Sequence, residues 1–195
     1  MKRIFDIITS SIILLIFLPF GLLISFFIIF ESRGGMFYLQ ERIGKKGIPF
    51  KLMKFRSMRV DADKEGKLTI GMKDARITKV GLILRKLKLD EFPQFINVLK
   101  GDMSIVGPRP EVKEYVDLYS AEQRKVLNVK PGITDYASLE YFKENEILGN
   151  SENPKQTYIT EVMPAKLELN KKYLANPTII QDLKIMWLTF LKMIR

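Results

Sequence analysis

The stretch IITSSIILLIFLPFGLLISFFIIF, residues 7–30, decides the architecture of this chain of 195 residues, and it contains no charged side chain. A straight helix needs about 20 apolar residues to cross the hydrocarbon core of a bilayer, so the run is long enough to enter a membrane. It is too long for the apolar core of a secretory signal, and it lacks a small-residue cleavage site. We therefore expect it to remain in the mature protein as a membrane helix.

The centre of the run contains Pro19, followed by Phe20 and Gly21. Proline removes a backbone donor and clashes with the preceding turn, so we expect a break or kink that divides the helix into two arms. Basic residues, which stay on the cytoplasmic side of a membrane, flank the run at both ends, so both ends would lie on one side, as in a re-entrant hairpin. An ordinary transmembrane helix also tolerates a proline, and these residues alone leave both topologies open.

The C-terminal segment, residues 179–195, has the pattern of a basic amphipathic helix. The apolar face carries Leu183, Met186, Trp187, Phe190 and Ile194, and the opposite face carries Gln181, Lys184, Lys192 and Arg195. Such a helix lies among lipid headgroups or packs on the protein core, and the pattern leaves both open. Residues 80–89 form a shorter amphipathic pattern that leads into an acidic pair.

The composition restricts the chemistry. The chain has 32 basic and 22 acidic residues, a formal net charge of +10, no histidine and no cysteine. Imidazole bases, thiolate nucleophiles, disulfides and soft zinc sites are thereby excluded, which leaves carboxylates, hydroxyls, amines and hard cations bound by oxygen. The charge indicates an anionic partner such as a phosphorylated substrate or an anionic membrane. No groove-reading or base-stacking motif accompanies it, so we expect no nucleic acid partner.

The acidic pair is Asp90 and Glu91. It precedes a predicted short helix at residues 93–99, which has proline in its first turn and Gly101 just past its end. The helix N-terminus and the nearby Arg85 favour ionised carboxylates, as a nucleophile or a metal ligand requires. The commoner role of such a pair is a helix cap with a surface charge, and the pair alone does not decide between the two.

The segment GDMSIVGPRP, residues 101–110, holds Arg109 between two prolines. Their locked φ angles restrict where the guanidinium can point, which suits a bidentate phosphate clamp. Earlier in the chain, residues 50–58 are rich in β-formers and predict a strand, although basic residues interrupt its alternation.

Taken together, these stretches resemble the monotopic phosphoglycosyl transferases, the bacterial sugar transferases that begin glycan assembly on polyprenyl phosphate. The resemblance spans almost the whole chain and corresponds to the minimal form of the family, without additional spans or a large N-terminal domain. Besides the proline-broken N-terminal segment, it rests on KFRSM (residues 54–58), LDEFPQ (89–94), GDMSIVGPRP (101–110) and KPGIT (130–134).

The resemblance implies an α+β fold: a mainly helical, compact catalytic domain with little strand, a re-entrant membrane helix broken at Pro19, and interfacial amphipathic helices. We expect a single domain over residues 1–195. Its parts would be the re-entrant helix (1–32), the cytoplasmic catalytic core (33–178) and the interfacial helix (179–195).

The resemblance also implies a reaction. Asp90 would attack the β-phosphate of a UDP-sugar, release UMP and carry a covalent phosphosugar, which undecaprenyl phosphate would accept in a second displacement. This is the first membrane step in the synthesis of capsule, exopolysaccharide, O-antigen or glycoprotein glycan. Glu91 matches the family's Mg²⁺ ligand, consistent with the oxygen donors that this ion prefers.

Further site residues follow from the matched motifs. The expected phosphate-binding residues are Arg85, Arg109 and Arg56, and the expected nucleotide-sugar region comprises Pro131, Gly132 and Thr134. The expected partners are the UDP-sugar, undecaprenyl phosphate and the phospholipid membrane, and a homodimer is compatible with the sequence. The expected location is the bacterial inner (cytoplasmic) membrane, with the catalytic domain on its cytoplasmic face.

Two residues depart from the family pattern. Leu18 stands where relatives have serine before the proline of the break, which removes a hydroxyl that could bond freed carbonyls. Asp135 follows Pro-Gly-Ile-Thr where many members have glycine. The alternative function is a catalytically inactive membrane scaffold or regulator of polysaccharide assembly, against which the intact Asp90, Glu91 and Arg109 argue.

Overall fold

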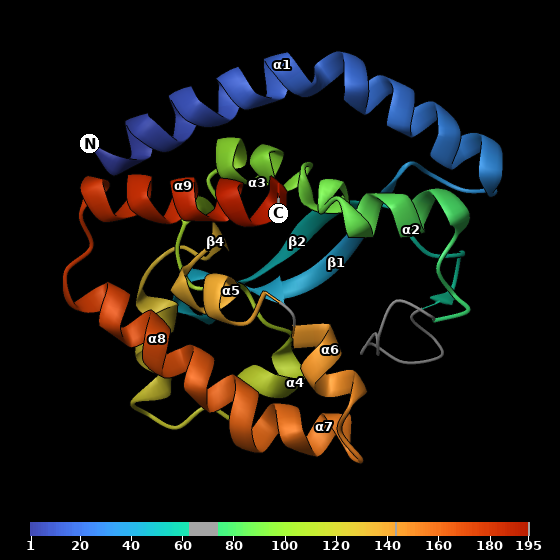
Figure 1. Ribbon diagram of the computed structural model, residues 1–195. Helices are drawn as coiled ribbons and strands as arrows, with labels where there is room; N and C mark the ends of the chain where they lie inside the picture. Colours follow the sequence, from blue (N-terminus) through green and yellow to red (C-terminus); the bar gives the residue numbers. More distant parts are fainter. Residues whose placement is uncertain (63–73, 143, 195) are drawn as a thin grey trace.

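The computed structural model describes residues 1–62, 74–142 and 144–194, with the backbone alone described at residues 145 and 194. The described residues form a mainly helical α+β fold with four short strands in two sheets, which confirms the expected fold class. Figure 1 shows the long helix α1 (Lys2–Glu31) lying across one side of the domain, with α3 (Gln94–Lys100) and the C-terminal helix α9 (Ile179–Ile194) beneath it.

Helix α1 is continuous, and Pro19 lies inside it. In Figure 1 the helix is bowed along its length. Proline costs the helix one backbone bond, to the carbonyl four residues earlier, while the other turns keep theirs. The sequence predicted a break or a kink at Pro19, and the structure has one continuous, bent helix with no break there.

The apolar surface of α1 is largely uncovered. Leu15 is 73% exposed and Phe30 is 84% exposed. Among the described helices, α1 alone is long and apolar enough to cross a membrane, and 11% of its most apolar window is buried in the protein. The core helix of a soluble protein would be mostly buried, so this surface indicates a membrane-bound protein.

Polar contacts bind the N-terminal end of α1 to the domain. Lys2 forms an ion pair with the buried Asp182 of α9, and Arg3 donates to two carbonyls at the end of α3, at 2.5 and 2.9 Å. Asp6 is buried and accepts from the hydroxyl of Ser104 at 2.8 Å. These contacts fix where this end of the helix lies.

Arg56 binds the other end of α1. Its buried guanidinium donates to the carbonyls of Ile28, Ser32 and Arg33, at 3.3, 2.7 and 2.8 Å. The last carbonyls of a helix have no partner within the helix, so Arg56 acts as a C-terminal cap. The sequence assigned Arg56 to phosphate binding, whereas the structure places its guanidinium under the membrane helix.

A β-hairpin follows α1. Strands β1 (Phe37–Ile43) and β2 (Pro49–Phe55) are antiparallel, with Phe37 opposite Phe55, and η1 (Lys45–Gly47) joins them. The strand predicted at residues 50–58 is confirmed as β2, which ends three residues earlier than predicted. The sequence analysis did not identify β1.

The next segment brings the acidic pair into place. Helix α2 (Lys79–Lys86) is capped by Thr78, and the carboxylate of Glu31 accepts from its first two amides at 2.7 and 2.9 Å. The turn η3 (Leu89–Glu91) leads into α3, which begins after Pro93 and ends at Gly101, where φ is 95°. The predicted helix at residues 93–99 is therefore confirmed, with the acidic pair immediately before it.

The rest of the chain builds the core. Strands β3 (Ser104–Val106) and β4 (Gly132–Thr134) form a short parallel sheet between α3 and α9. Two clusters of buried apolar side chains lie around it, one centred on Val98, Met103 and Ile185 and the other on Tyr115, Val126 and Leu167. The remaining elements are α4 (Lys113–Val116), η4 (Gln123–Asn128), α5 (Tyr136–Glu140), α6 (Glu144–Gly149), α7 (Pro154–Thr157), η5 (Tyr158–Val162) and α8 (Met163–Ala175).

Helix α9 has one buried side and one exposed apolar side. Ile185 is fully buried, whereas Leu183, Trp187 and Phe190 are 49, 60 and 56% exposed. The predicted apolar face is thus mostly not the face that packs on the core, although Met186 does pack there. The side chain of Ile194 and all of Arg195 lie outside the described residues.

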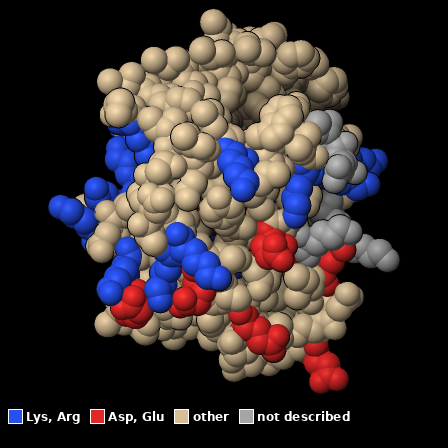
Figure 2. Space-filling view, turned by 60° about the vertical axis from the view of Figure 1, so that its left-hand side comes forward, with Lys and Arg blue, Asp and Glu red and all other residues tan. Residues whose placement is uncertain are grey.

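Charge is distributed unevenly over the surface. Figure 2 shows an upper region without coloured side chains, then a band with Lys and Arg alone, and acidic side chains in the lower half of the view. Because this view is turned about the vertical axis of Figure 1, its upper region corresponds to the level of α1. The acidic side chains on this face therefore lie away from the apolar surface.

Candidate active site

Asp90 and Glu91 lie in the turn η3, between the end of α2 and the start of α3. The turn is entered through Lys88, whose φ of 56° places it in the left-handed region. This reversal turns the chain back toward β2, and Asp90 is only 8% exposed. The pair therefore faces the protein. The alternative, a helix cap with a surface charge, would leave it exposed.

Two cations hold the Glu91 carboxylate. The Lys54 ammonium from β2 lies 3.0 Å from Glu91 Oε1, and the Arg109 guanidinium binds the same oxygen. Burial opposes the ionisation of Glu91, but Arg109 and Lys54 together hold its pKa well below the ordinary value. Glu91 is therefore an ionised carboxylate, and its second oxygen takes part in none of these contacts.

Asp90 is in a different environment, although it is the adjacent residue. No donor among the described residues bonds its carboxylate. Burial and the charge of Glu91 raise the pKa of Asp90, and Lys54, Arg85 and Lys88 offset only part of that shift. The pKa of Glu91 thus shifts in the expected direction, whereas the pKa of Asp90 shifts in the opposite direction.

Arg85 lies at the end of α2, beside the pair. Its Nε donates to the hydroxyl of Ser57 at 2.9 Å, which fixes the guanidinium beside the turn. Burial lowers the pKa of Arg85, and the charge of Asp90 raises it. The structure therefore brings Arg85 and Arg109 to the acidic pair, as the sequence predicted, and does not bring Arg56 there.

The buried carboxylate of Asp135 fixes the loop Pro108-Arg109-Pro110 through a backbone hydrogen bond. The Arg109 amide donates to Asp135 Oδ2 at 3.1 Å, and the Ser138 amide donates to Asp135 Oδ1 at 2.6 Å. Asp135 is fully buried, so one carboxylate caps α5 and holds the arginine loop together. The residue that departs from the family pattern is thus part of the support of Arg109.

Pro131, Gly132 and Thr134 also support this loop. The Gly107 amide donates to the Thr134 carbonyl at 3.1 Å, and the Gly132 amide donates to the Pro108 carbonyl at 2.9 Å. The Pro131 carbonyl accepts from the amide of Ser104 at 2.8 Å. The expected nucleotide-sugar region therefore forms, in the structure, the strand against which the Pro-Arg-Pro loop packs.

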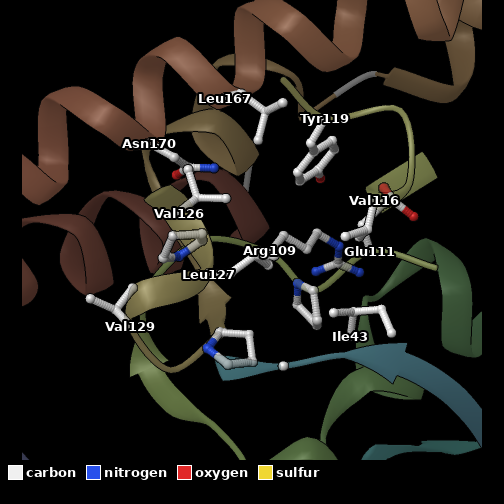
Figure 3. Close-up of a pocket in the computed structure, with 14 residues that line it drawn as sticks. Ile43, Arg109, Glu111, Val116, Tyr119, Val126, Leu127, Val129, Leu167 and Asn170 are labelled. Carbon is white, nitrogen blue, oxygen red and sulfur yellow. The ribbon is translucent and has the colours of Figure 1, made fainter. Parts of the chain in front are cut away.

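A small cavity with a volume of about 20 Å³ lies on the far side of this loop. Figure 3 shows Arg109 in its centre, with Asn170 and Leu167 of α8 to one side and Tyr119 and Val116 to the other. The lining is mostly apolar, and Asn170 Oδ1 is buried without a donor among the described residues. The cavity is polar enough at this point to hold ordered water, which would bond Asn170.

Sequence reasoning missed two residues beside the pair. Lys54 lies in the KFRSM motif, where its charge interrupts the strand pattern, but the sequence did not indicate a role for it in the site. Lys88 lies with its ammonium 5.2 Å from the centre of the Phe142 ring. Its left-handed backbone has no sequence signal of the kind that glycine gives.

The two carboxylates fit a hard cation with few protein ligands. The described residues contain no cluster of three or more Asp, Glu, His or Cys side chains that would form an all-protein site. Mg²⁺ commonly takes only one or two carboxylates and completes its shell with water and substrate phosphates. The second oxygen of Glu91 has no hydrogen-bond donor in the part of the chain that the structure describes, which leaves it available to such a ligand. Lys54, Arg85 and Arg109 add charge that suits phosphate chemistry.

Comparisons with known proteins agree with this chemistry. The family model described as bacterial sugar transferase matches residues 1–195. The chain is 37% identical over 195 residues to the uncharacterized sugar transferase EpsL of Bacillus subtilis, which covers all of this chain and 87% of that protein.

Two relatives have names that state a reaction. A UDP-glucose:undecaprenyl-phosphate glucose-1-phosphate transferase of Klebsiella pneumoniae is 39% identical over 194 residues, 98% of this chain and 39% of that protein. A UDP-N-acetylgalactosamine-undecaprenyl-phosphate N-acetylgalactosaminephosphotransferase of Aeromonas hydrophila is 41% identical over 143 residues, 71% of this chain and 33% of that protein. This chain thus spans less than half the length of these two relatives.

We predict that Gly132→Ala destabilises the protein, because the added Cβ would lie 2.1 Å from the amide nitrogen of Gly107. Backbone cannot give way as a flexible side chain does, so we expect a loss of about 3 kcal/mol. For a chain of this size the loss lowers Tm by roughly 6–12 °C, measured in detergent.

Gly149→Ala is the matched control, because a Cβ there meets nothing within 4 Å. Its Tm should stay within about 3 °C of the parent or rise slightly. Equal Tm values for both variants would contradict the close contact between Gly132 and Gly107.

Proposed function

This chain belongs to the bacterial sugar transferase family, and on that premise we propose that it transfers a phosphosugar from a UDP-sugar to undecaprenyl phosphate. The products are polyprenyl-diphosphate-sugar and UMP. The observation that carries the proposal is a difference in contacts between two adjacent carboxylates. Glu91 is bound by two cations, whereas Asp90 has no hydrogen-bond donor among the described residues.

Asp90 is the nucleophile in this proposal. A carboxylate whose lone pairs accept no hydrogen bond is available to attack, and burial makes it less well solvated. Its oxygen forms a bond to the β-phosphorus of the UDP-sugar while the bond to the bridging oxygen breaks. The electron pair of that bond leaves with UMP, and the phosphosugar remains on Asp90 as an acyl phosphate.

The second displacement regenerates the enzyme. An oxygen of undecaprenyl phosphate attacks the same phosphorus, and the bond to the Asp90 oxygen breaks. The free carboxylate returns and the diphosphate-linked sugar stays on the lipid. Two displacements at one phosphorus through a covalent phosphosugar-aspartate constitute a ping-pong mechanism.

The cations make this attack feasible. A carboxylate and a diphosphate repel each other, so charge must be neutralised before they can meet. Arg85 and Lys54 lie close enough to influence the charge of Asp90, and the Pro-Arg-Pro loop holds Arg109 on the side of Glu91. We propose Arg85 and Arg109 as the phosphate-binding residues, with Lys54 as a third cation that also orients Glu91.

Glu91 would hold Mg²⁺ through the oxygen that Lys54 and Arg109 leave free. When bound there, the ion would neutralise diphosphate charge and stabilise the leaving oxygen. Lys54 and Arg109 lower the pKa of Glu91 and orient its carboxylate. The two carboxylates thereby receive separate roles in one turn.

The membrane placement follows from α1. Both ends of this apolar helix are bound to the same domain, by Lys2 to α9 and by Arg56 at its C-terminus. Contacts of both ends with one domain support a placement in which both ends lie on the same side of the bilayer, whereas a helix that spans the hydrocarbon core has its ends on opposite sides. We propose that α1 enters the inner membrane from the cytoplasmic face and returns, while α9 lies among the headgroups. The active site then meets a soluble nucleotide and a lipid phosphate at one surface.

We predict that Asp90→Asn lowers turnover by about 10⁴-fold or more, because the amide cannot form the covalent phosphosugar. The assay follows label from a panel of UDP-sugars to polyprenyl phosphate with Mg²⁺ present. Mass spectrometry of the protein incubated without acceptor should show the adduct in the parent and none in Asp90→Asn.

Asp117→Asn is the matched control, because Asp117 is exposed and pairs with Lys113 on the surface. It should transfer at the parent rate. Parent-like transfer by Asp90→Asn would rule out the nucleophile, and no transfer by the parent across the panel would favour the inactive scaffold.

We predict that Glu91→Gln raises the Mg²⁺ concentration needed for half-maximal rate by about 10-fold or more, because an amide oxygen is a weaker ligand for this ion. The measurement is the transfer rate across a Mg²⁺ titration at saturating UDP-sugar. Glu122→Gln, an exposed glutamate that pairs with Lys125, is the control and should leave the titration unchanged. An unchanged titration for Glu91→Gln would argue that the ion binds elsewhere.

We predict that both ends of α1 are accessible from the same side of the membrane. The chain has no native cysteine, so single cysteines can be placed in a short N-terminal extension and at the exposed Lys46. An impermeant thiol reagent should leave both unlabelled in intact cells and label both in inverted vesicles. Labelling of the two positions from opposite sides would establish a transmembrane helix instead.

A further inference from the structure

The exposed charge on the helices next to the apolar surface is almost entirely positive. Helices α1, α2, α3 and α9 contain three acidic residues among the described residues. Asp6 and Asp182 are buried at 3 and 2% exposure, and the Glu31 carboxylate accepts from the first two amides of α2. The negative charge of these helices is therefore already bound within the protein.

Four exposed lysines on the same helices have no acidic partner among the described residues. They are Lys79 and Lys86 of α2, Lys100 of α3 and Lys184 of α9, which we call the cationic rim. Five lysines on the opposite side of the domain are paired: Lys113 with Asp117, Lys125 with Glu122, Lys155 with Glu114, Lys166 with Glu144 and Lys171 with Glu168. The charge of the rim lysines is thus less compensated than the charge of these five.

The rim lysines alternate with exposed apolar side chains on the same helix faces. On α9, Lys184 lies one turn from Ile180, which is 79% exposed, and one turn from Trp187, which is 60% exposed. On α2, Lys79 lies one turn before Ile83, which is 58% exposed. Lysine in such a position lays its aliphatic stem along apolar surface and extends its ammonium group to the headgroup level.

Figure 2 agrees with this arrangement. On the face that it shows, the band of basic side chains lies directly below the uncoloured upper region and has no acidic side chain within it. A belt of this kind meets the phosphates of a bilayer when the apolar surface is inserted. Its charge complements a surface that carries net negative charge.

We propose that the cationic rim binds the headgroups of anionic phospholipids in preference to zwitterionic ones. An anionic headgroup presents a phosphate without the compensating ammonium of phosphatidylcholine, so unpaired lysines attract it more strongly. The proposal rests on the membrane placement proposed above and does not depend on the transfer reaction. The bound lipid is part of the surrounding membrane, and it is neither donor nor acceptor.

The chain contains its own reporter for this interaction. Trp187 is its single tryptophan, and it lies on the exposed apolar face of α9, one turn from Lys184. We would reconstitute the full-length protein in liposomes with an equal mole fraction of brominated phosphatidylglycerol or brominated phosphatidylcholine. At low salt, quenching of Trp187 by the anionic lipid should exceed quenching by the zwitterionic lipid by about two-fold or more. The ratio should approach one near 1 M salt, where the screening length is about 3 Å.

Two triple variants separate the rim from net charge. The test variant combines Lys79→Gln, Lys86→Gln and Lys184→Gln, and the control combines Lys113→Gln, Lys125→Gln and Lys155→Gln. Each variant removes three positive charges, but the control lysines lie on the paired side of the domain. The quenching ratio should fall toward one in the test variant and stay at the parent value in the control.

Several results would overturn the proposal. A ratio of one in the parent at low salt, or equal ratios in the two triple variants, would show that the rim does not select anionic lipid. If the test variant does not fold, as judged by its Tm, the salt dependence of the parent decides in its place, and a ratio unaffected by salt would count against the rim. Absence of quenching by either lipid would also refute the interfacial position of α9, while the transfer assay above would be unaffected.

Discussion

The ionised Glu91 carboxylate, bound by Lys54 and Arg109, is the interaction on which the site depends. Lys54 and Glu91 are 37 residues apart, and Glu91 and Arg109 are 18 residues apart, so the contact joins β2, the turn η3 and the Pro-Arg-Pro loop. The three side chains are partly buried, so removing either cation would leave the Glu91 charge less well compensated. The Pro-Arg-Pro loop must therefore hold Arg109 close to Glu91. The close contact of Gly107 with Gly132 and the hydrogen bond from the Arg109 amide to Asp135 fix the loop in this position.

The features that sequence predicted correctly depend on local rules. The apolar run before Glu31, the proline and glycine that bound α3, and the start of α9 after Thr178 each arise from chemistry within a few residues. The features that it missed depend on distant partners. Arg56 looked like a phosphate ligand because it lies in a basic motif, but it reaches the end of a helix 28 residues earlier in the chain. No pattern within β2 could indicate that Lys54 would meet Glu91, and none within β1 identified it as a strand partner.

Polar contacts at both ends of α1 add to its apolar packing and help to define where it lies on the domain. Lipid tails are as apolar as leucine, so an apolar helix gains little by exchanging lipid for protein. Buried polar groups favour one position of the helix over others more strongly, because a buried polar group without a hydrogen-bond partner is costly in free energy. Asp6, bonded to Ser104 at 2.8 Å, and Arg56, bonded to the Ser32 carbonyl at 2.7 Å, supply this discrimination near the two ends of the helix. In the middle of α1, Phe17 stacks on Phe92 on the domain side, while Leu15, Leu18 and Leu22 are exposed on the outer side.

The bond between Glu31 and the start of α2 has a mechanical consequence. Helix α2 has eight residues and is therefore a stiff rod about 12 Å long, which begins at the membrane helix and ends at the turn that carries Asp90. In the proposed placement, the height of the nucleophile above the lipid is set by where α1 settles and by the length of this rod. A thinner or thicker bilayer would move Asp90 relative to the lipid phosphate. The transfer reaction would then be altered without a change in any residue that touches substrate.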